Sequence, residues 1–395
     1  MVKSLYKKHI ILIGNYSPDS QESMERFAIM LQEGFKLQNL KVELWKPNVL
    51  IGKWSSSTNK GFGKWLGYID KWILFPFILR WRFITGGSKF SETQFHICDH
   101  SNAPYLKYFP QDQVSITCHD VLAIRGAFGY TDAYCSASKF GIILQKWILR
   151  NLLKAKTIIA VSNFTMKQLK ELAARYNVPA KNWLVILNGF NAEFNPVKPW
   201  IVNRTLIKQG LNPEQPFILH VGSQLERKNR KLLLQMVDNL SDRWNGKIYY
   251  AGKALDPALI AQANDLGLSN RIVSIVKPSH QTLLALYSKC EAFIFPSFSE
   301  GFGWPLIEAQ ACGAPVIASN YEPMPEVSGG AALHCNPENP AAFAKAFLSL
   351  NDVTVKTKLV KDGFKNTLSF QRTDMINAYL ELFAIDKESI LCFSN

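Results

Sequence analysis

The chain has 395 residues, 47% hydrophobic and 19% charged, which excludes a disordered chain and predicts two domains of roughly 150–200 residues. The formal net charge is +14, divided into +13 for residues 1–200 and +1 for residues 201–395. The best candidate for a membrane span, Trp72–Leu79, is far shorter than the roughly 20 apolar residues required, and Ile10–Ile13 is too short for a signal peptide.

The uneven charge predicts different partners for the two halves of the chain. A basic first half suits an anionic membrane leaflet, a polyanionic substrate or nucleic acid, although a solvated basic surface has the same composition. The seven cysteines form no C-x-x-C pair, which favours reduced thiols. We expect a cytoplasmic protein that can associate with the cytosolic face of a membrane.

Short apolar runs alternate with helical patterns along the whole chain, as βαβ units require. In the first half the expected strands are His9–Asn15, Lys41–Trp45, Gln94–Cys98, Val114–Cys118, Thr157–Val161 and Trp183–Leu187. In the second half they are Pro216–Val221, Lys247–Ala251, Ile272–Val276, Ala292–Phe295, Ala314–Ala318 and Ala331–His334. The pattern predicts an α/β protein with two Rossmann-like, doubly wound parallel sheets facing a cleft. The proline-rich segment 195–215 predicts the boundary, with domains at 1–198 and 199–369.

A glycine-rich segment follows the expected strand Ala292–Phe295 and opens a helix. Gly301 and Gly303 let a ligand approach the backbone, and Pro305 suits the first turn of a helix that runs from Leu306 and stops before Gly313. The free N–H groups of such a helix predict a diphosphate site. Glu300 lies before the helix and Glu308 inside it, so their carboxylates can accept hydroxyl groups at opposite ends of one ligand.

The sequence E-G-F-G-W-P-L-I-E from Glu300 to Glu308 closely resembles the E-x7-E motif of family 4 (group 1) retaining glycosyltransferases, which have the GT-B fold. The resemblance implies a nucleoside diphosphate sugar as donor. It assigns the ribose to Glu308 and the sugar to Glu300 and the nearby backbone. The donor-binding segment then comprises Gly301, Phe302, Gly303, Pro305 and Leu306.

Further stretches share this resemblance. His220–Asn229 is similar to the family's phosphate-binding turn, so Arg227 and Lys228 are assigned to the diphosphate, beside Ser223, which stands where some relatives have Arg. Lys277, after the strand Ile272–Val276, is expected near the base. Val185–Phe190 resembles the end of the family's first domain, and Leu368–Phe370 resembles the start of a helix, at about 370–386, that crosses back to it.

In the first half, the resemblance places His119 beside the reacting sugar, with Asp120 polarising the imidazole. His119, Asp120 and Glu300 are the expected catalytic residues. A front-face path is implied, in which the donor's β-phosphate oxygen takes the acceptor proton, rather than a covalent intermediate on Asp120 or Glu300. The loop after the first strand keeps Gly14 of the family's Gly-Gly pair, and Gly14 is expected near the donor.

His96, Cys98 and His100 alternate and would share one face of an extended strand, a pattern compatible with a metal site. Their place at a strand end facing the cleft favours polar contacts with an acceptor instead. The chain has no D-x-D pair, which favours a metal-independent enzyme. We expect no cofactor and no metal.

Aromatic and basic residues alternate from Trp54 to Phe83. This pattern is compatible with a helix at a membrane interface, with a nucleic-acid surface, or with an amphipathic helix packed on the first sheet. A lipid-linked acceptor would explain both this stretch and the basic first half, so nucleic acid is not expected as a partner.

The prediction is a retaining, metal-independent hexosyltransferase that uses a GDP- or UDP-linked sugar and a glycan or lipid-linked acceptor. The R-K-N form of the phosphate turn is common among mannosyltransferases of the resembling family, which favours GDP-mannose. Two alternatives are a nucleotide-sugar epimerase of the same fold and a membrane-bound scaffold with a degenerate site. Joint retention of Arg227, Lys228, Glu300 and Glu308 argues against the scaffold.

Overall fold

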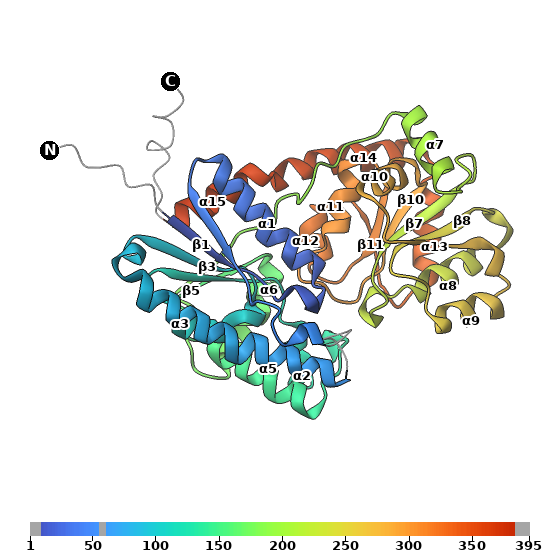
Figure 1. Ribbon diagram of the computed structural model, residues 1–395. Helices are drawn as coiled ribbons and strands as arrows, with labels where there is room; N and C mark the ends of the chain where they lie inside the picture. The colour runs from blue at the N-terminus through green and yellow to red at the C-terminus, as the bar shows by residue number, and fades with distance from the viewer. Residues whose placement is uncertain (1–8, 55–60, 384–395) are drawn as a thin grey trace, which may run out of the picture.

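The computed structural model describes residues 9–54 and 61–383 and contains two parallel sheets, each with helices on both faces (Figure 1). Residues 55–60 of the aromatic stretch, Cys392 and the end of the helix expected at about 370–386 lie outside the described residues. Every strand that the sequence predicts is formed, with small shifts at the ends. The sequence-based prediction of two Rossmann-like sheets is therefore confirmed.

The first sheet has the strand order β2-β1-β3-β4-β5-β6, and all its neighbours are parallel. Its register pairs His9 with Lys41 on one side and with Thr93 on the other. Its strands are β1 His9–Ile13, β2 Lys41–Trp45, β3 Thr93–Ile97, β4 Val114–Cys118, β5 Thr157–Ala160 and β6 Asn182–Val185.

Alternate residues of each strand enter two separate cores, because successive side chains of a strand point to opposite faces. Ile11 and Ile13 of β1 face the core under α3, α5 and α6, whereas Ile10 and Leu12 face the core under α1 and under the last described helix, α15 Arg372–Leu382. The helices that follow these strands are α1 Glu22–Leu37, α2 Gly61–Ile69, α3 Phe75–Gly86, α4 Leu122–Ala127, α5 Lys139–Leu152 and α6 Asn163–Ala174. Burial on both faces explains why the strands read as nearly continuous apolar runs.

The second sheet has the order β12-β11-β10-β7-β8-β9, so the direction of winding reverses between β7 and β10. Ligands of doubly wound sheets bind beyond the carboxyl ends of the strands at such a reversal. The strands are β7 Phe217–Gly222, β8 Lys247–Gly252, β9 Ile272–Val276, β10 Ala292–Phe295, β11 Val316–Ser319 and β12 Leu333–Cys335. We therefore expect a ligand site at the segments that follow β7 and β10.

Helices cover both faces of the second sheet as well (Figure 1). One core lies under α7, α10, α11 and α12, and the other under α8, α9 and α13. These helices are α7 Pro199–Lys208, α8 Lys231–Leu240, α9 Pro257–Asp265, α10 His280–Lys289, α11 Trp304–Ala311, α12 Met324–Ser328, α13 Pro340–Ser349 and α14 Val353–Thr367.

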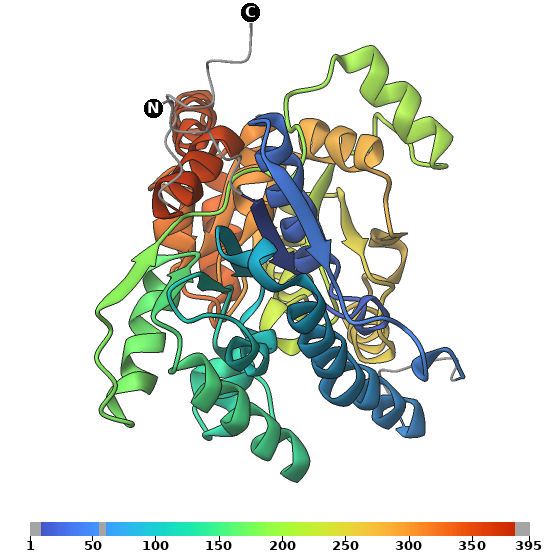
Figure 2. The same cartoon turned by 60° about the vertical axis from the view of Figure 1, so that its left-hand side comes forward.

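The final described helix, α15 Arg372–Leu382, returns to the first sheet. Figures 1 and 2 show it, in red, beside the blue helix α1. Ile376 packs directly over Gly34 of α1, and Tyr379 shares a core with Phe27. Where the chain passes between the sheets, the N–H of Phe190 donates to the carbonyl of Phe370 at 3.0 Å. The domain boundaries at 198 and 369 themselves stay a prediction.

The two sheets are joined through the N-terminus of α6. The Ser162 and Thr165 hydroxyls donate to the carbonyl of Gly301 at 2.7 and 3.1 Å. Glu326 of α12 accepts the backbone N–H groups of Asn163 and Phe164 at 2.7 and 3.1 Å. A carboxylate placed there satisfies N–H groups that a helix leaves free and complements its dipole.

The aromatic, basic stretch forms a continuous helical segment made of α2, the π-helix η3 Asp70–Leu74 and α3. Phe75 and Leu79 are buried against the first sheet, as the amphipathic reading predicts. Within residues 9–54 and 61–383, no helix has both the length and the apolar character needed to cross a bilayer.

Candidate functional site

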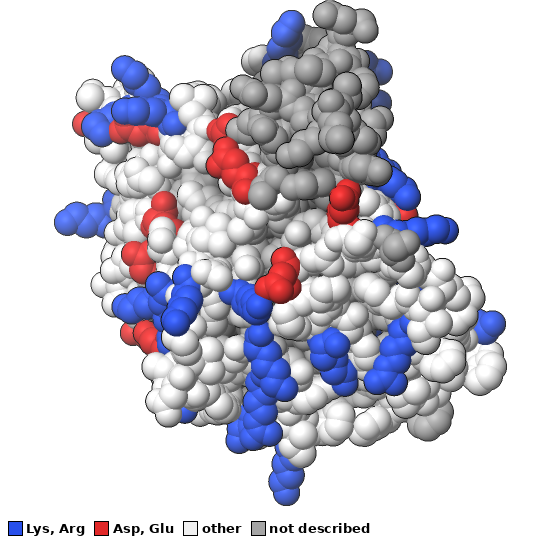
Figure 3. All heavy atoms as spheres, turned by 90° about the vertical axis from the view of Figure 1, so that its left-hand side faces the viewer, with Lys and Arg blue, Asp and Glu red and all other residues white. Residues whose placement is uncertain are grey.

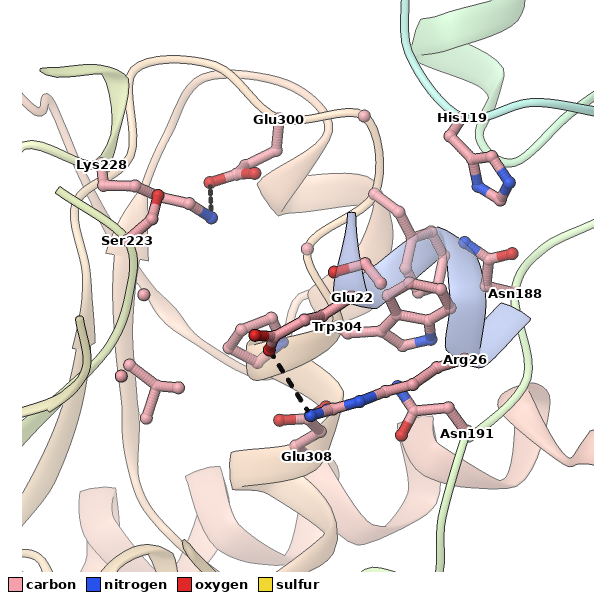
Figure 4. Close-up of a pocket in the computed structure, with 18 of the residues that line it drawn as sticks. Glu22, Arg26, His119, Asn188, Asn191, Ser223, Lys228, Glu300, Trp304 and Glu308 are labelled. Carbon is pink, nitrogen blue, oxygen red and sulfur yellow. Dashed lines mark hydrogen bonds and ion pairs between the residues drawn. The ribbon is translucent and has the colours of Figure 1, made fainter. Parts of the chain in front are cut away.

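A cavity of about 470 Å³ lies between the two sheets, beyond the carboxyl ends of β7 and β10 (Figure 4). One wall comes from the turn after β7 and the segment that leads into α11. The other wall comes from the N-terminus of α1, the residues after β4 and the loop after β6. The cavity thus occupies the reversal point of the second sheet and is bounded on its other side by the first domain.

The turn after β7 places two cations in this cavity. Arg227 and Lys228 belong to the short helix η7 Glu226–Lys228, which ends at Asn229 in the left-handed region, with φ 49°. The Asn229 amide donates to the carbonyls of Pro296 and Pro337 at 3.2 and 2.7 Å. This amide ties the turn to the segment after β10, so the two cations have a fixed position relative to α11.

Glu300 is buried between these cations. Its carboxylate lies 2.5 Å from the Arg227 guanidinium and 2.6 Å from the Lys228 ammonium. Burial opposes ionisation of Glu300, but the two cations outweigh it and lower its pKa to about 2. The carboxylate is therefore ionised at neutral pH and is a weak base.

The backbone between Glu300 and α11 passes close to the first domain. A Cβ atom on Gly301 would overlap the carbonyl oxygen of His119, so this position requires glycine. Gly303 has φ 103° and forms the N-cap of α11, where it contributes no side chain to the free N–H groups. The helix begins at Trp304, two residues before the predicted start, and Pro305 occupies its first turn, as predicted.

Glu308 lies at the other end of the cavity from Glu300 (Figure 4). The Tyr287 hydroxyl donates to its carboxylate at 3.0 Å. Burial raises the pKa of Glu308 to about 7, and the Tyr287 hydroxyl and the Arg26 charge only partly offset this effect. The same wall therefore holds two carboxyl groups with different pKa values, because ion pairing lowers the pKa of Glu300 and burial raises that of Glu308.

His119 faces these groups from the first domain (Figure 4). Its Nε2 lies 2.8 Å from the carbonyl oxygen of Cys98, and because a carbonyl only accepts, Nε2 carries the proton. Burial lowers the pKa of His119, although the Asp99 carboxylate opposes the shift. A neutral imidazole is left with Nδ1 as an acceptor.

The predicted polarisation of His119 by Asp120 is not formed as a hydrogen bond. The Asp120 carboxylate accepts the backbone N–H of Leu122 at 3.0 Å, at the start of α4. A short carboxylate in that position satisfies a helix N–H that is otherwise free, and the Cys98 carbonyl orients His119 instead.

The structure brings most of the predicted site residues together. His119, Asp120, Ser223, Arg227, Lys228, Lys277, Glu300, Gly301, Phe302, Gly303, Pro305 and Glu308 all line the cavity. Gly14 and Leu306 do not: the Gly14 N–H donates to the carbonyl of Trp45 at 2.9 Å, and Leu306 is fully buried in the core under α11. The roles assigned to all of these residues stay predictions.

Several lining residues have no assigned role in the sequence analysis. Glu22 and Arg26 come from the first turns of α1, and Asn188 and Asn191 follow β6. Asn188 belongs to the stretch that resembles the end of the family's first domain, which was a usable signal. The sequence gave no signal for Arg26, because charged residues at helical spacing are typical of any solvated helix surface.

His96 and Cys98 belong to the first sheet and its core rather than to the cavity. The His96 imidazole lies 2.8 Å from the Ser115 hydroxyl and 2.9 Å from the Thr117 hydroxyl. Both ring nitrogens are therefore engaged by the neighbouring strand. The described part of the chain contains no group of three His, Cys, Asp or Glu side chains arranged to hold a metal ion.

Comparison with known proteins agrees with this geometry. Residues 203–358, which include β7, β10 and α11, match the family described as glycosyl transferases group 1. The matched segment therefore contains Arg227, Lys228, Glu300 and Glu308 together.

Two curated relatives are O-antigen mannosyltransferases. The chain is 29% identical to O-antigen chain mannosyltransferase B of Escherichia coli over 60% of its length and 63% of the relative's. It is 27% identical to O-antigen chain mannosyltransferase RfbU of Salmonella typhimurium over 71% of each chain. The structure of HepE from Anabaena in complex with UDP and glucose has a TM-score of 0.67 over 95% of this chain and 99% of that one, at 16% identity. The chain therefore has the GT-B fold, and in residues 203–358 and in its curated relatives it is similar to group 1 glycosyltransferases.

Proposed function

We propose that the protein transfers a hexosyl unit, mannosyl in the first instance, from a nucleoside diphosphate sugar to a glycan or lipid-linked acceptor. The observation that carries the proposal is the placement of Glu300 between Arg227 and Lys228, across one cavity from Glu308. A diphosphate needs the cations, and the hydroxyl groups of a ribose and a sugar need the two carboxylates.

In this proposal the donor lies along the second domain. Glu308 accepts the ribose hydroxyls, and Lys277, which also lines the cavity, lies near the base. The diphosphate meets the N-terminus of α11 together with Arg227 and Lys228. Glu300 and the neighbouring backbone N–H groups hold the sugar, and His119 approaches it from the first domain.

The two cations act on the leaving group. As the sugar departs, negative charge grows on the nucleoside diphosphate, and fixed positive groups lower the energy of that charge in a site shielded from water. Since Arg227, Lys228 and the helix N-terminus supply this positive charge, we propose a metal-independent reaction.

The state of Glu300 disfavours a covalent intermediate, so we propose that retention follows a front-face path. A carboxylate with a pKa of about 2, paired with two cations, is poorly suited to remove a proton or to form a covalent bond with the sugar. Glu300 therefore binds and orients, and the donor's β-phosphate oxygen accepts the proton of the attacking hydroxyl.

The choice of sugar and base rests on the relatives. Both curated relatives named above are mannosyltransferases, and the R-K-N turn is preserved at Arg227–Asn229, which favours GDP-mannose. The HepE complex contains UDP and glucose, which keeps UDP-linked sugars in the test panel. The relatives favour neither the epimerase nor the scaffold.

The test is a thermal-shift panel of GDP, UDP and their sugars, with wild type, Glu308→Ala and the exposed control Glu338→Ala. Ligand at 100 times Kd adds roughly 2.7 kcal/mol of stability, a shift of several degrees. We expect a shift for one base, retained in the control and lost in Glu308→Ala. Absence of a shift with every nucleotide contradicts the proposal. A coupled transfer assay then determines the anomeric configuration of the product by NMR, and an inverted product contradicts retention.

A further inference from the structure

An apolar stripe runs along the outside of the first domain. Ile73, Phe77, Trp81 and Ile84 follow one another at intervals of four, four and three residues, which places them on one side of the helical segment formed by η3 and α3. Their exposed fractions are 62%, 71%, 59% and 81%. The opposite side of the same segment is buried in the core. Large apolar side chains exposed in a row differ from the scattered ones found on any soluble protein.

The neighbouring helix α5 extends this stripe into a wider surface. Phe140, Ile143 and Trp147 are exposed at intervals of three and four residues. Trp65 of α2 contacts Phe140 with ring centroids 4.9 Å apart, and Trp72 contacts Trp147 at 5.0 Å. Figures 1 and 2 show α2, α3 and α5 side by side at the base of the first domain. We call the exposed set the aromatic face: Trp65, Ile73, Phe77, Trp81, Ile84, Phe140, Ile143 and Trp147.

Positive charge surrounds the aromatic face. Segments 61–90 and 139–156 contain ten Lys and Arg residues, five in each, and one acidic residue, Asp70, which is fully buried. Over the lower part of the surface in Figure 3, where Figure 1 has α3 and α5, blue side chains stand among uncharged white ones, while acidic side chains gather mainly higher up. Lys71 is paired with Asp19 and Lys156 with Asp112, and the other eight cations belong to the segments that carry the apolar surface.

The aromatic face is held rigidly to the domain. The Asp70 carboxylate accepts the hydroxyl of Tyr16 at 2.7 Å and the backbone N–H groups of Ile51 and Gly52, each at 2.9 Å. The Lys71 ammonium lies 2.7 Å from Asp19. These contacts fix the junction of α2 and α3, so exposure of the aromatic face does not depend on a loose helix.

We propose that the aromatic face docks on an anionic lipid bilayer. Tryptophan and phenylalanine enter the headgroup region, and Lys and Arg at the rim contact anionic lipids, which is the arrangement of helices that lie in a membrane surface. A protein partner fits less well, because protein interfaces are depleted in lysine and this rim contains Lys64, Lys139 and Lys146. If the acceptor is lipid-linked, which rests on the proposed function, docking brings the first domain to the acceptor.

The apolar part of the proposal is tested by sedimentation with phosphatidylcholine vesicles that contain or lack phosphatidylglycerol. Wild type is expected to bind the anionic vesicles and to bind the neutral ones weakly. The double variant Phe77→Ser, Trp81→Ser removes two exposed anchors and should weaken binding at least about tenfold. The matched control, Trp200→Ser with Ile207→Ser on α7, removes two equally exposed side chains from the second domain and should bind like wild type.

The role of the positive charge is tested with the double variant Lys64→Glu, Lys139→Glu. The matched control is the double variant Lys361→Glu, Lys365→Glu on α14. The first pair should weaken binding about tenfold or more and reduce its sensitivity to salt, and the second should not. Nucleotide thermal shifts on the same samples report separately on fold and donor site. Failure of wild type to bind anionic vesicles, or equal losses in test and control variants, overturns the proposal. So does a dimer that Trp81→Ser dissociates in the absence of vesicle binding, since the aromatic face would then join two copies.

Discussion

Residues 1–200 have an excess of 13 positive charges, whereas residues 201–395, with a net charge of +1, hold the buried ion pairs of the cleft. In the second domain Arg227 and Lys228 are matched by Glu300 within 2.6 Å. The first domain offers the cleft a neutral His119 and the amides of Asn188 and Asn191, together with the side chains of Glu22, Arg26 and Asp120. The net charge of a domain therefore indicates a surface that can bind partners, whereas buried ion pairs indicate where the reaction takes place.

The largest expected effect comes from removing one cation of the second domain. Lys228→Ala should reduce kcat/KM by roughly 10²–10³-fold, because a fixed positive group near the leaving diphosphate is lost. The measurement is steady-state transfer with the donor identified by the thermal-shift panel. Lys231→Ala, an exposed lysine three residues later, is the matched control and should keep near wild-type activity. Equal losses in both variants would contradict the role assigned to Lys228.

The second prediction separates the two carboxyl groups of the same wall by pH. Glu308 has its pKa raised from 4.5 to about 7, so the folded protein binds more protons here than the unfolded chain does. Its contribution to the free energy of unfolding is full below pH 4.5 and is lost as pH rises through 7, by roughly 3 kcal/mol. Glu300, with a lowered pKa, contributes in the opposite sense: its stabilisation is present above pH 4.5 and is lost toward pH 2.

Urea unfolding at about pH 5 and about pH 8 measures this difference. Glu308→Gln should flatten the dependence between these two values, and the exposed control Glu338→Gln should retain the wild-type slope. If Glu308→Gln and wild type show the same slope, the raised pKa of Glu308 is not the source of the pH dependence.

The smallest effect is expected at the contact between the two domains. Gly301→Ala places a methyl group against the His119 carbonyl and should lower the free energy of unfolding by about 1–3 kcal/mol. Gly141→Ala, in the first turn of α5, meets only the side chains of Ser138 and Ala137 and should be neutral or slightly stabilising. Unfolding curves that coincide for wild type and Gly301→Ala would show that the domains do not meet as closely as described.

Much of the fold was predictable because parallel strands that are buried on both faces have short, continuous apolar sequences. Ile10–Ile13 and Ala292–Phe295 are of this kind, and their helical connections made the topology easy to infer. Arg227, Lys228, Glu300 and Glu308 were predictable since they lie within short motifs at fixed spacing.

Residues contributed by the first domain were harder to predict. Arg26 reaches the cavity because α1 is placed across it by its packing on the first sheet and α15, and no local pattern records that placement. Asp120 is adjacent to His119 in sequence, yet its carboxylate turns to the N–H of Leu122. Contacts of these kinds depend on tertiary packing and on competition between nearby donors. The spacing of residues in the sequence records neither of these.

The chain passes between the domains twice, and the two passages lie against each other. Phe190 on one is hydrogen-bonded to Phe370 on the other, and a Cβ on Gly189 would crowd the backbone of Arg372. Two adjoining connections form a double-stranded hinge, which bends more readily than it swivels. We therefore expect any relative motion of the two domains to bend these two connections together. Such bending would keep the first domain aligned over Glu300 and Glu308.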